Sequence, residues 1–472
     1  MSKRDVKTKI VCTIGPASRA RETIAAMIEA GMNVARLNFA HGTFDEHAAI
    51  IGDVRAAARD TGRRVAILAD LPGPKLRIGR LAEQPVELER GQEFTLEVGE
   101  FTGDARRAST TFARLPQAVK PGDTIFLNDG LVQLAVKSVS GEAVRCEVAV
   151  GGALLSNKGI NLPDVDLGIE AFTERDRECL SFALEQGADA VGQSFVQDAN
   201  DLRAVRDAAR SAGREIPVFA KIERAQALRR IDEILTAADG IMVARGDLGV
   251  EIPIESIAVT QKQLIEKANR LAKPAITATQ MLLSMVENRR PTRAEVTDVA
   301  NAILDGTDCV MLSEESAIGA YPVEAVQMLS RIASATESQL RPRLEPEPEP
   351  ADAATATQAL VAASVADMAA RVRPAGILVP SHGGTMARRI ARYRLPAWVT
   401  AVSALEATCQ ALQFVYGVEA LHQAEPPASW YAFARTHFHG RAGTQPGARI
   451  LLTQDVETAE SPSVSRLELV EL

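Results

Sequence analysis

Eight times along the chain, a short run of β-branched or other apolar residues is followed by an amphipathic segment with helical spacing. Parallel strands need a crossover element between them, and a helix of this kind usually supplies it. Eight such units are typical of a TIM (β/α)8 barrel, and an open doubly wound sheet fits this one-strand, one-helix period less well. The predicted strands cover residues 10–15, 32–39, 65–71, 188–196, 217–223, 240–246, 274–281 and 308–313.

The repeat is interrupted once, after the third strand, by residues 72–168. This stretch alternates polar and apolar residues and is punctuated by Gly, Pro and Asp, which predicts a small β-barrel domain. An insertion after the third strand lies above the carboxyl ends of the barrel strands, where barrel enzymes build their active sites. We therefore expect a hinged lid.

A second change of texture follows the eighth unit. Residues 344–354 are rich in proline and glutamate, which is typical of a linker. Beyond them a helix is predicted at 355–372 and a strand at 376–380. The sequence thus predicts four parts: a discontinuous barrel (1–71 and 169–343), the lid (72–168), the linker (344–354) and a C-terminal α/β open-sheet domain (355–472).

The charge balance argues against nucleic acid or an anionic membrane as a partner, because 53 Lys and Arg stand against 61 Asp and Glu. No apolar run reaches the roughly 18 residues that a membrane-spanning helix needs, and the first residues contain no apolar signal region. The five cysteines are scattered and form no Cys-x-x-Cys pair, so neither a disulfide framework nor a zinc site is expected. We expect a cytoplasmic protein.

Polar residues gather where the predicted strands end, which is the edge at which a barrel places its reactive groups. Period-two alternation puts Lys221 and Glu223 on one face of their strand. Glu223 and Asp247, from neighbouring strands, can offer carboxylate oxygens to one hard cation such as Mg²⁺. The full set is Arg36, Asn38, His41, Asp70, Lys221, Glu223, Gly246, Asp247 and Thr279.

This set is suited to phosphoryl transfer. Lys221 and Arg36 supply positive charge, the backbone N–H groups of Gly246 and Asp247 can hold a carboxylate, and Thr279 can orient or deliver a proton. Taken singly, each residue also fits a structural role as an ion pair or helix cap. Two other functions stay open: a metal-dependent enolate lyase or aldolase on a barrel, and a catalytically idle metabolite-binding paralogue.

Long motifs make the chain resemble pyruvate kinase over essentially its whole length. The resemblance implies the same three-domain architecture, a homotetramer, and a Mg²⁺- or Mn²⁺-dependent phosphotransferase that moves phosphate from phosphoenolpyruvate to ADP, yielding pyruvate and ATP. The motifs that carry it lie at residues 9–18, 33–42, 158–163, 220–223, 241–251, 278–282 and 291–301.

The resemblance also implies residue roles. Lys221 looks like the phosphoryl-transfer lysine, Arg36 like the phosphate-contacting arginine, and Thr279 like the threonine of the enolate-protonating relay. Glu223 and Asp247 look like the ligands of the divalent metal. The residues implied on the nucleotide side are Asn38, His41, Arg77 and Lys158.

The chain departs from K⁺-dependent members of that family. It keeps Asn38 and Asp70 but has Ala40 and Leu71 where those members carry a serine and a threonine, and Lys75 where they carry a glutamate. We expect the Lys75 ammonium to pair with Asp70 and to replace the monovalent cation. A unit charge at ~4 Å is worth about 4 kcal/mol at an effective dielectric of ~20, whichever atom carries it. The sequence thus predicts activity without K⁺.

The C-terminal domain carries a loop that can cradle a phosphate through Ser381, Thr385 and the backbone of Gly383 and Gly384. Residues 457–467 lack the glycine-rich segment that would close over fructose 1,6-bisphosphate, so we do not expect that activator. Another phosphorylated effector, or a purely structural and subunit-contact role, stays open. Near the eighth strand, Glu314 replaces the usual glycine, and we expect it to point sideways or to pair with an arginine.

Overall fold

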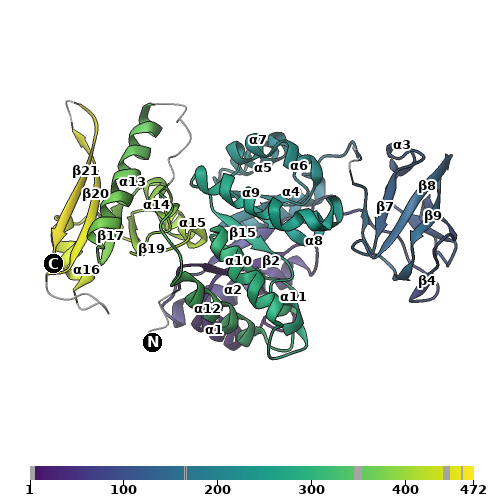
Figure 1. The fold of residues 1–472 in the computed structure, drawn as a ribbon, viewed down its shortest axis with the longest axis horizontal. Helices are drawn as coiled ribbons and strands as arrows, with labels where there is room; N and C mark the ends of the chain where they lie inside the picture. Colours follow the sequence, from purple (N-terminus) through teal and green to yellow (C-terminus); the bar gives the residue numbers. More distant parts are fainter. Residues whose placement is uncertain (1–5, 164, 166, 345–352, 440–446, 459–460) are drawn as a thin grey trace.

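The computed structural model describes residues 6–163, 165, 167–344, 353–439, 447–458 and 461–472. Three bodies follow one another along the long axis: the C-terminal sheet, the barrel and the inserted β domain (Figure 1). The predicted linker falls almost entirely outside the described residues, as do residues 459 and 460 of the segment predicted to lack an effector loop. Among the described helices, none has the length and apolarity needed to cross a membrane.

Eight parallel strands close into a barrel in the order β1-β16-β15-β14-β13-β12-β3-β2, which confirms the predicted fold. All eight predicted barrel strands are present, and each is shorter than predicted because residues expected at its ends lie outside the hydrogen-bonded ladder. Their bounds are β1 (Lys9–Thr13), β2 (Met32–Asn38), β3 (Ala66–Asp70), β12 (Ala190–Gln193), β13 (Val218–Ile222), β14 (Gly240–Ala244), β15 (Ala275–Ala278) and β16 (Cys309–Leu312).

Helices surround the barrel and bury their apolar stripes against the strands. Several begin at a capping box, in which a Thr or Asp at the N-cap and an acidic residue three positions later satisfy each other's backbone N–H groups. The helices are α1 (Arg21–Ala30), α2 (Phe44–Asp60), α4 (Glu174–Glu185), α5 (Ala199–Ser211), α6 (Ala225–Arg229), α7 (Ile231–Ala237), α8 (Arg245–Glu251), α9 (Ile257–Arg270), α10 (Arg293–Asp305), α11 (Glu314–Ala317) and α12 (Pro322–Glu337).

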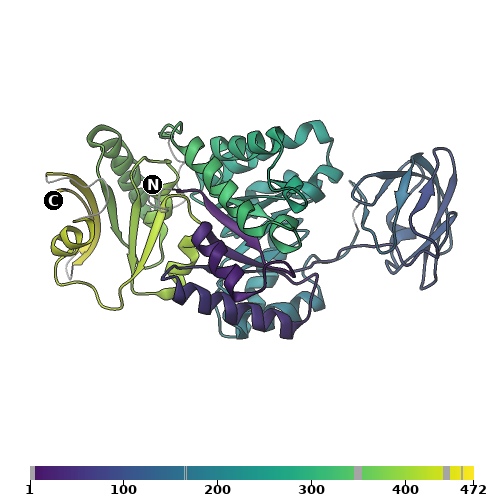
Figure 2. The same ribbon diagram turned by 90° about the horizontal axis from the view of Figure 1, so that it is seen from below.

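The insert is the all-β domain expected after the third strand. Its main sheet has the order β11-β7-β8-β9-β5-β6, and β10 pairs with β4 in a second ladder. Two chain segments join it to the barrel (Figure 2). Its elements are β4 (Val86–Leu88), β5 (Glu93–Val98), β6 (Arg107–Thr110), α3 (Leu115–Ala118), β7 (Thr124–Leu127), β8 (Val132–Ser140), β9 (Ala143–Val150), β10 (Gly152–Leu154) and β11 (Ile160–Asn161).

The C-terminal body is an open five-stranded sheet of order β19-β18-β17-β20-β21 with helices packed on it, as predicted. Its last strand runs antiparallel to its neighbour. All five cysteines of the chain are free and buried. The elements of this body are α13 (Ala353–Val372), β17 (Gly376–Pro380), α14 (Thr385–Ala391), β18 (Val399–Ser403), α15 (Glu406–Ala411), η3 (Leu412–Phe414), β19 (Val418–His422), α16 (Trp430–Phe438), β20 (Arg449–Thr458) and β21 (Ser461–Glu471).

One buried carboxylate fastens both segments that lead to the insert. Asp176, in the first turn of α4, is fully buried. Its Oδ1 accepts from the backbone N–H of Gly73 on the outgoing segment at 2.9 Å. Its Oδ2 accepts from the N–H of Thr173 on the returning segment at 2.8 Å and from the Thr173 hydroxyl at 2.6 Å. The two segments therefore leave the barrel from one fixed point.

We expect Asp176→Ala to lower the free energy of unfolding by about 3 kcal/mol, because it leaves the half-buried N–H of Gly73 and the cap of α4 without acceptors. Glu46→Ala is the matched control, since Glu46 occupies the same capping-box position of α2 on the surface. That change should cost about 1 kcal/mol or less. Urea unfolding of both variants measures the difference. Equally small losses of unfolding free energy would show that Asp176 does not fasten the two segments.

Candidate active site

The ammonium group of Lys221 lies at the centre of a buried charge cluster at the carboxyl ends of the barrel strands. Its Nζ is 3.1 Å from Oδ1 of Asp70 and 3.1 Å from Oε1 of Glu223. It also donates to the hydroxyl of Ser194 at 2.6 Å. These side chains lie at or just beyond the carboxyl ends of three neighbouring strands, β3, β12 and β13, and the parallel order of the strands brings them together.

Lys221 and Asp70 hold each other in the ionised state. Burial disfavours the charged form of Lys221, but the carboxylates of Asp70 and Glu223 outweigh it, so the pKa of Lys221 is raised. Burial likewise opposes ionisation of Asp70, yet Arg36 and Lys221 lower the pKa of that carboxyl. The barrel mouth therefore presents a fixed ammonium next to a fixed carboxylate at neutral pH.

Arg36 joins the cluster from β2. Its Nε and Nη2 lie 2.6 and 2.5 Å from Oδ2 of Asp70, and its Nη1 donates to the hydroxyl of Thr13 at 2.7 Å. Only 8% of the residue is exposed. These bonds fix the plane of the guanidinium group, which leaves its outer edge as a rigid positive surface.

Glu223 and Asp247 form the expected pair of carboxylates. Burial raises the pKa of Glu223, and the nearby charge of Asp247 raises it further against the opposing charge of Lys221. Oε2 of Glu223 accepts from the N–H of Phe195 at 2.7 Å, which orients the carboxylate. Two hard oxygen donors that repel each other fit a divalent cation that keeps open positions. Within the described residues, no group of three or more His, Cys, Asp or Glu side chains could hold a metal.

Thr279 and Gly246 face each other across the ends of β15 and β14. The N–H of Gly246 donates to the Thr279 hydroxyl at 2.8 Å, and that hydroxyl donates to the Ala278 carbonyl at 2.6 Å. Thr279 and Gln280 both have positive φ angles, 69° and 54°. Such backbone strain persists where the surroundings enforce it and is frequent in functional sites.

Arg245 enforces this conformation. Its guanidinium donates to the carbonyls of Ala278 and Thr279 at 3.2 and 2.7 Å and is anchored by Asp298 at 2.7 Å. Glu315 is fully buried and receives the N–H of Leu282 at 3.0 Å. The loop that carries Thr279 is therefore held from both sides.

Of the residues implied on the nucleotide side, Asn38 and His41 belong to the barrel, and Arg77 and Lys158 belong to the insert. His41 is exposed, and its pKa is lowered by partial desolvation and by the charges of Arg77, Lys75 and Arg36. Asn38 accepts the N–H of Ala40 at 3.2 Å. Arg77 donates to the carbonyl of Asn157 in the insert at 2.8 Å. Lys158 lies in the same part of the insert and, among the described residues, has no ion pair.

Lys75 differs from our expectation. Its Nζ lies 3.6 Å from Oδ1 of Asp247, whereas Asp70 is paired with Arg36 and Lys221. Asp70 is only 1% exposed, so two cations from the barrel already occupy its surroundings. The expected Lys75–Asp70 pair is therefore wrong for this structure, although Lys75 does bring positive charge to the carboxylates of the site.

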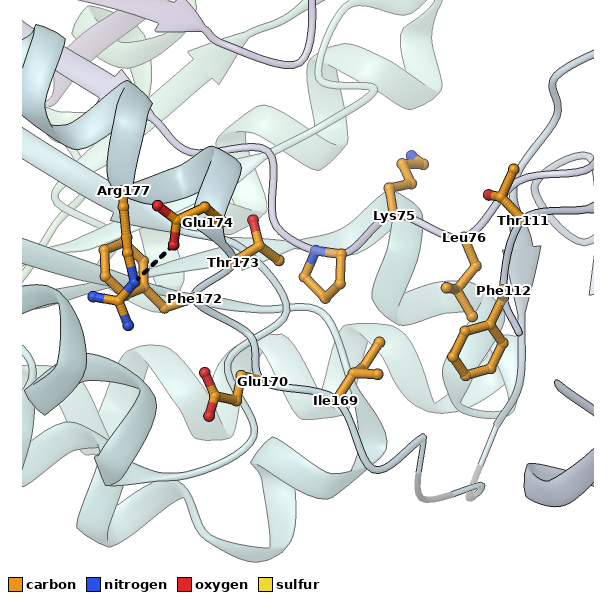
Figure 3. A pocket seen from close by; sticks show the side chains of 11 residues that line it. Lys75, Leu76, Thr111, Phe112, Ile169, Glu170, Phe172, Thr173, Glu174 and Arg177 are labelled. Atoms are coloured by element: carbon orange, nitrogen blue, oxygen red, sulfur yellow. Dashed lines mark ion pairs between the residues drawn. The ribbon is translucent and has the colours of Figure 1, made fainter. Parts of the chain in front are cut away.

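A cavity of about 590 Å³ opens beside the two segments that join the insert to the barrel (Figure 3). Leu76 and Phe112 lie close together on one side, and Phe172, Glu174 and Arg177 lie on the other. The guanidinium of Arg177 lies 4.7 Å from the centre of the Phe172 ring. This open space lies between the base of the insert and α4.

Ser194, Thr13 and Arg245 were not among the predicted site residues. Ser194 follows the fourth barrel strand and Thr13 ends the first, so the same strand-end criterion that found Lys221 also applies to them. Gly192 belongs with them, because a Cβ there would lie 3.3 Å from Oδ1 of Asp70. Arg245 stands within a motif, but only its contacts reveal that it supports the Thr279 loop.

The predicted effector loop lies between β17 and α14, in the body on the opposite side of the barrel from the insert (Figure 1). Its polar atoms bond within the loop. Ser381 accepts the N–H of Gly384 at 3.0 Å, and Arg388 donates to Thr385 at 3.2 Å and to the Gly383 carbonyl at 3.1 Å. Phosphate binding there stays a prediction.

Two neighbouring glutamates after the eighth strand, Glu314 and Glu315, differ in burial. Glu314 is exposed, and no arginine of the described chain is paired with it. The neighbouring Glu315 is the buried residue. The Ser316 hydroxyl donates to the Thr13 carbonyl at 2.8 Å, which ties this turn to β1.

Comparisons with known proteins agree with this geometry. A family model described as "Pyruvate kinase, barrel domain" matches residues 5–326, and one described as "Pyruvate kinase, alpha/beta domain" matches residues 359–466. A pyruvate kinase of Thermococcus litoralis is 50% identical over 87% of this chain and 88% of its own length. One from Geobacillus stearothermophilus is 45% identical over 87% of this chain and 71% of its own length.

A crystal structure of a pyruvate kinase from Cryptosporidium parvum superimposes with a TM-score of 0.89 at 32% identity. The superposition covers 99% of this chain and 97% of the Cryptosporidium parvum chain. Matches of this extent include the barrel, the insert and the C-terminal body together. The chain therefore belongs to the pyruvate kinase family, whose members are phosphotransferases.

Proposed function

We propose that this protein transfers the phosphoryl group of phosphoenolpyruvate to ADP, giving pyruvate and ATP. The observation that carries the proposal is the fixed Lys221 ammonium, 3.1 Å from both Asp70 and Glu223 at the mouth of the barrel. In the transfer, the bond between phosphorus and the enol oxygen breaks, and a bond to a β-phosphate oxygen of ADP forms. The enolate left behind takes a proton on carbon and becomes the ketone of pyruvate.

Lys221 and Arg36 stabilise the charge on the transferred group. Both are held rigidly, Lys221 by Ser194 and two carboxylates and Arg36 by Asp70 and Thr13. Fixed charges of this kind need no reorganisation when the transition state forms, which is the main source of catalysis in phosphoryl transfer.

Glu223 and Asp247 are the residues that would hold Mg²⁺ or Mn²⁺. A bound divalent cation would neutralise oxygen charges of the substrate. The backbone N–H groups of Gly246 and Asp247 lie next to this pair and would hold the carboxylate of the substrate, that of Gly246 after it gives up its bond to Thr279. Thr279 would orient the proton that the enolate receives. Its bond from Gly246 keeps the hydroxyl at the edge of the site.

Residues 72–168 would act as the lid. Arg77 and Lys158 bring positive charge from the lid side to the phosphates of the nucleotide, and Asn38 and His41 line its other side. Closing such a lid excludes water from the transfer. The proposed domains are the barrel (1–71 and 169–343), the lid (72–168) and the C-terminal domain (355–472), with a linker at 344–354.

Lys75 would take the place of K⁺. Ala40 and Leu71 present no hydroxyl groups for an ion, and the Lys75 ammonium lies 3.6 Å from Asp247 at the substrate side of the cluster. A tethered ammonium provides one positive charge without recruiting an ion from solution. From the family we further propose a cytoplasmic homotetramer with no nucleic acid or membrane partner.

The central test is pyruvate release coupled to lactate dehydrogenase. We expect release that depends on ADP, stops on chelation by EDTA and returns with Mg²⁺. Lys221→Met should lower kcat by about 10²–10³, because it removes one fixed charge from the transition state. Lys137→Met, at an exposed lysine of the insert, is the control and should not change kcat. Pyruvate release without ADP would instead indicate a lyase or aldolase, and phosphoenolpyruvate binding without turnover an idle paralogue.

We expect Gly246→Ala to fold normally, because a Cβ there meets only Thr279, at an ordinary 3.6 Å. The methyl group would occupy space reserved for the substrate carboxylate and should raise the KM for phosphoenolpyruvate about tenfold, a loss of about 1.4 kcal/mol. Gly249→Ala, on the same short helix, is the matched control and should leave that KM unchanged. Equal KM values for phosphoenolpyruvate in both variants would show that Gly246 is not part of the substrate site.

We expect the same kcat when tetramethylammonium chloride replaces KCl at constant ionic strength. Lys75→Glu should lower kcat at least about tenfold, because it places a third carboxylate beside Asp247 and Glu223. Lys75→Arg should keep most of the activity, and Lys137→Glu controls for charge reversal elsewhere in the insert. Strong activation of the wild-type protein by K⁺ would contradict the proposed role of Lys75.

A further inference from the structure

The N-terminal mouth of the barrel, opposite the active site, is closed by a residue of the C-terminal body. Phe414, the last residue of η3, is fully buried. It belongs to a cluster whose other members all lie on barrel strands, and every barrel strand contributes at least one. These members are Val11, Val34, Ala66, Leu68, Ala190, Phe219, Met242, Ile276, Ala278, Cys309 and Met311.

The segment that begins with Phe414, residues 414–418, is bonded to the first residues of β1 and β16 and to residues just before these strands. We call it the plug. The bonds run from Cys309 Sγ to the Phe414 carbonyl (3.2 Å), from Tyr416 N–H to Asp308 Oδ1 (3.0 Å), from Gly417 N–H to the Lys7 carbonyl (3.0 Å) and from Lys9 Nζ to the Val418 carbonyl (2.7 Å). The plug is therefore fixed at several points along its length.

Asp308 ties the plug to the strand that leads to Thr279. Its Oδ2 accepts from Arg394 of the C-terminal body at 2.9 Å and from the N–H of Ala275, the first residue of β15, at 3.1 Å. The Asp308–Arg394 pair is almost completely buried. A buried pair of this kind loses several kcal/mol when one partner is removed, so the contact between the two bodies is not readily broken.

Inside the barrel, Phe414 rests on Phe219 of β13. The ring centres are 4.7 Å apart and the ring planes are tilted by 41°. Phe219 stands opposite Gly240 of β14, where a Cβ would come within 2.4 Å of its ring. The Phe219 ring thus has one position, bounded by Gly240 and by Phe414.

Phe219 shares a face with the reactive groups of β13. Side chains two apart on a strand point to the same side, so Phe219 and Lys221 both point into the barrel, and Glu223 follows two residues later. One series of side chains therefore runs along the inside of the barrel, from Phe414 through Phe219 and Lys221 to Glu223. Its lower end belongs to the C-terminal body and its upper end to the active site.

We propose that Phe414 is a positioning residue for Lys221 and Glu223. By filling the lower mouth of the barrel, it fixes the Phe219 ring and with it the position of β13 relative to β12 and β14. The C-terminal body is then part of the catalytic apparatus, although it contributes no group to the active site. The effect on turnover rests on the proposed function, whereas the effect on β13 itself does not.

The experiment compares Phe414→Ala with Phe438→Ala. Phe438 is an equally buried phenylalanine of the C-terminal body, but it packs in a separate cluster away from the barrel interior. We measure Tm, kcat, both KM values and hydrogen exchange of peptides that cover β13, all at a temperature well below either Tm. Both variants should lose stability through the cavity that each creates.

Only Phe414→Ala should lower kcat, by at least about tenfold (1.4 kcal/mol of activation free energy), with the KM for ADP unchanged. Only this variant should also speed hydrogen exchange in β13. Phe414→Leu, which refills most of the space, should recover most of the wild-type kcat. This recovery separates positioning by volume from a general loss of folding.

The proposal is overturned if Phe414→Ala and Phe438→Ala show the same kcat and the same exchange in β13. Should Phe414→Ala fail to fold, the comparison passes to Phe414→Val, which refills less of the space than leucine, and Phe219→Leu. Each of these must slow turnover and change exchange in β13. Wild-type kcat and exchange in both would overturn the proposal. A wild-type protein that transfers no phosphate would overturn the proposed function alone, because exchange in β13 still decides the role of Phe414.

Discussion

The structure depends on keeping four charges buried at the mouth of one barrel. Arg36, Asp70, Lys221 and Glu223 are each less than a tenth exposed. Isolated charges would not tolerate this position, because removing each from water costs several kcal/mol. Alternating cation and carboxylate makes the cluster stable, and parallel strands that end at one edge bring the four side chains together. The same pairing that stabilises the cluster fixes the positive charge that phosphoryl transfer requires.

The other two bodies of the chain hold this cluster from its two sides. On the active-site side, Asp176 fastens both segments that lead to the insert to α4, and a cavity lies beside them. On the lower side, the plug fills the barrel mouth and contacts Phe219 on the strand that carries Lys221. The proposed lid would thus close over a charge cluster that the C-terminal body holds from the other side.

Local patterns predicted the barrel well, because each of its strands is apolar enough to be buried on both faces. The shortest strands of the insert, β6, β10 and β11, have only two to four residues, too few alternations for a sequence pattern to identify them. Thr13 ends a barrel strand and Ser194 follows one, but neither was predicted as a site residue, because a single hydroxyl residue is common at such positions. Arg245 and Glu315 support the Thr279 loop through contacts between distant segments, which no local pattern contains.

The sequence by itself determined the fold class, the order of the three bodies and the set of side chains at the strand ends, because hydrophobic period and strand polarity are local properties. Only the tertiary structure decided the partners within that set. Lys75 was expected beside Asp70, but Arg36 and Lys221 fill that position and Lys75 pairs with Asp247. Likewise, nothing near Phe414 in sequence indicates that it completes the interior of the barrel. Ion pairs and packing depend on distances between segments far apart along the chain, and these distances exist only once the chain has folded.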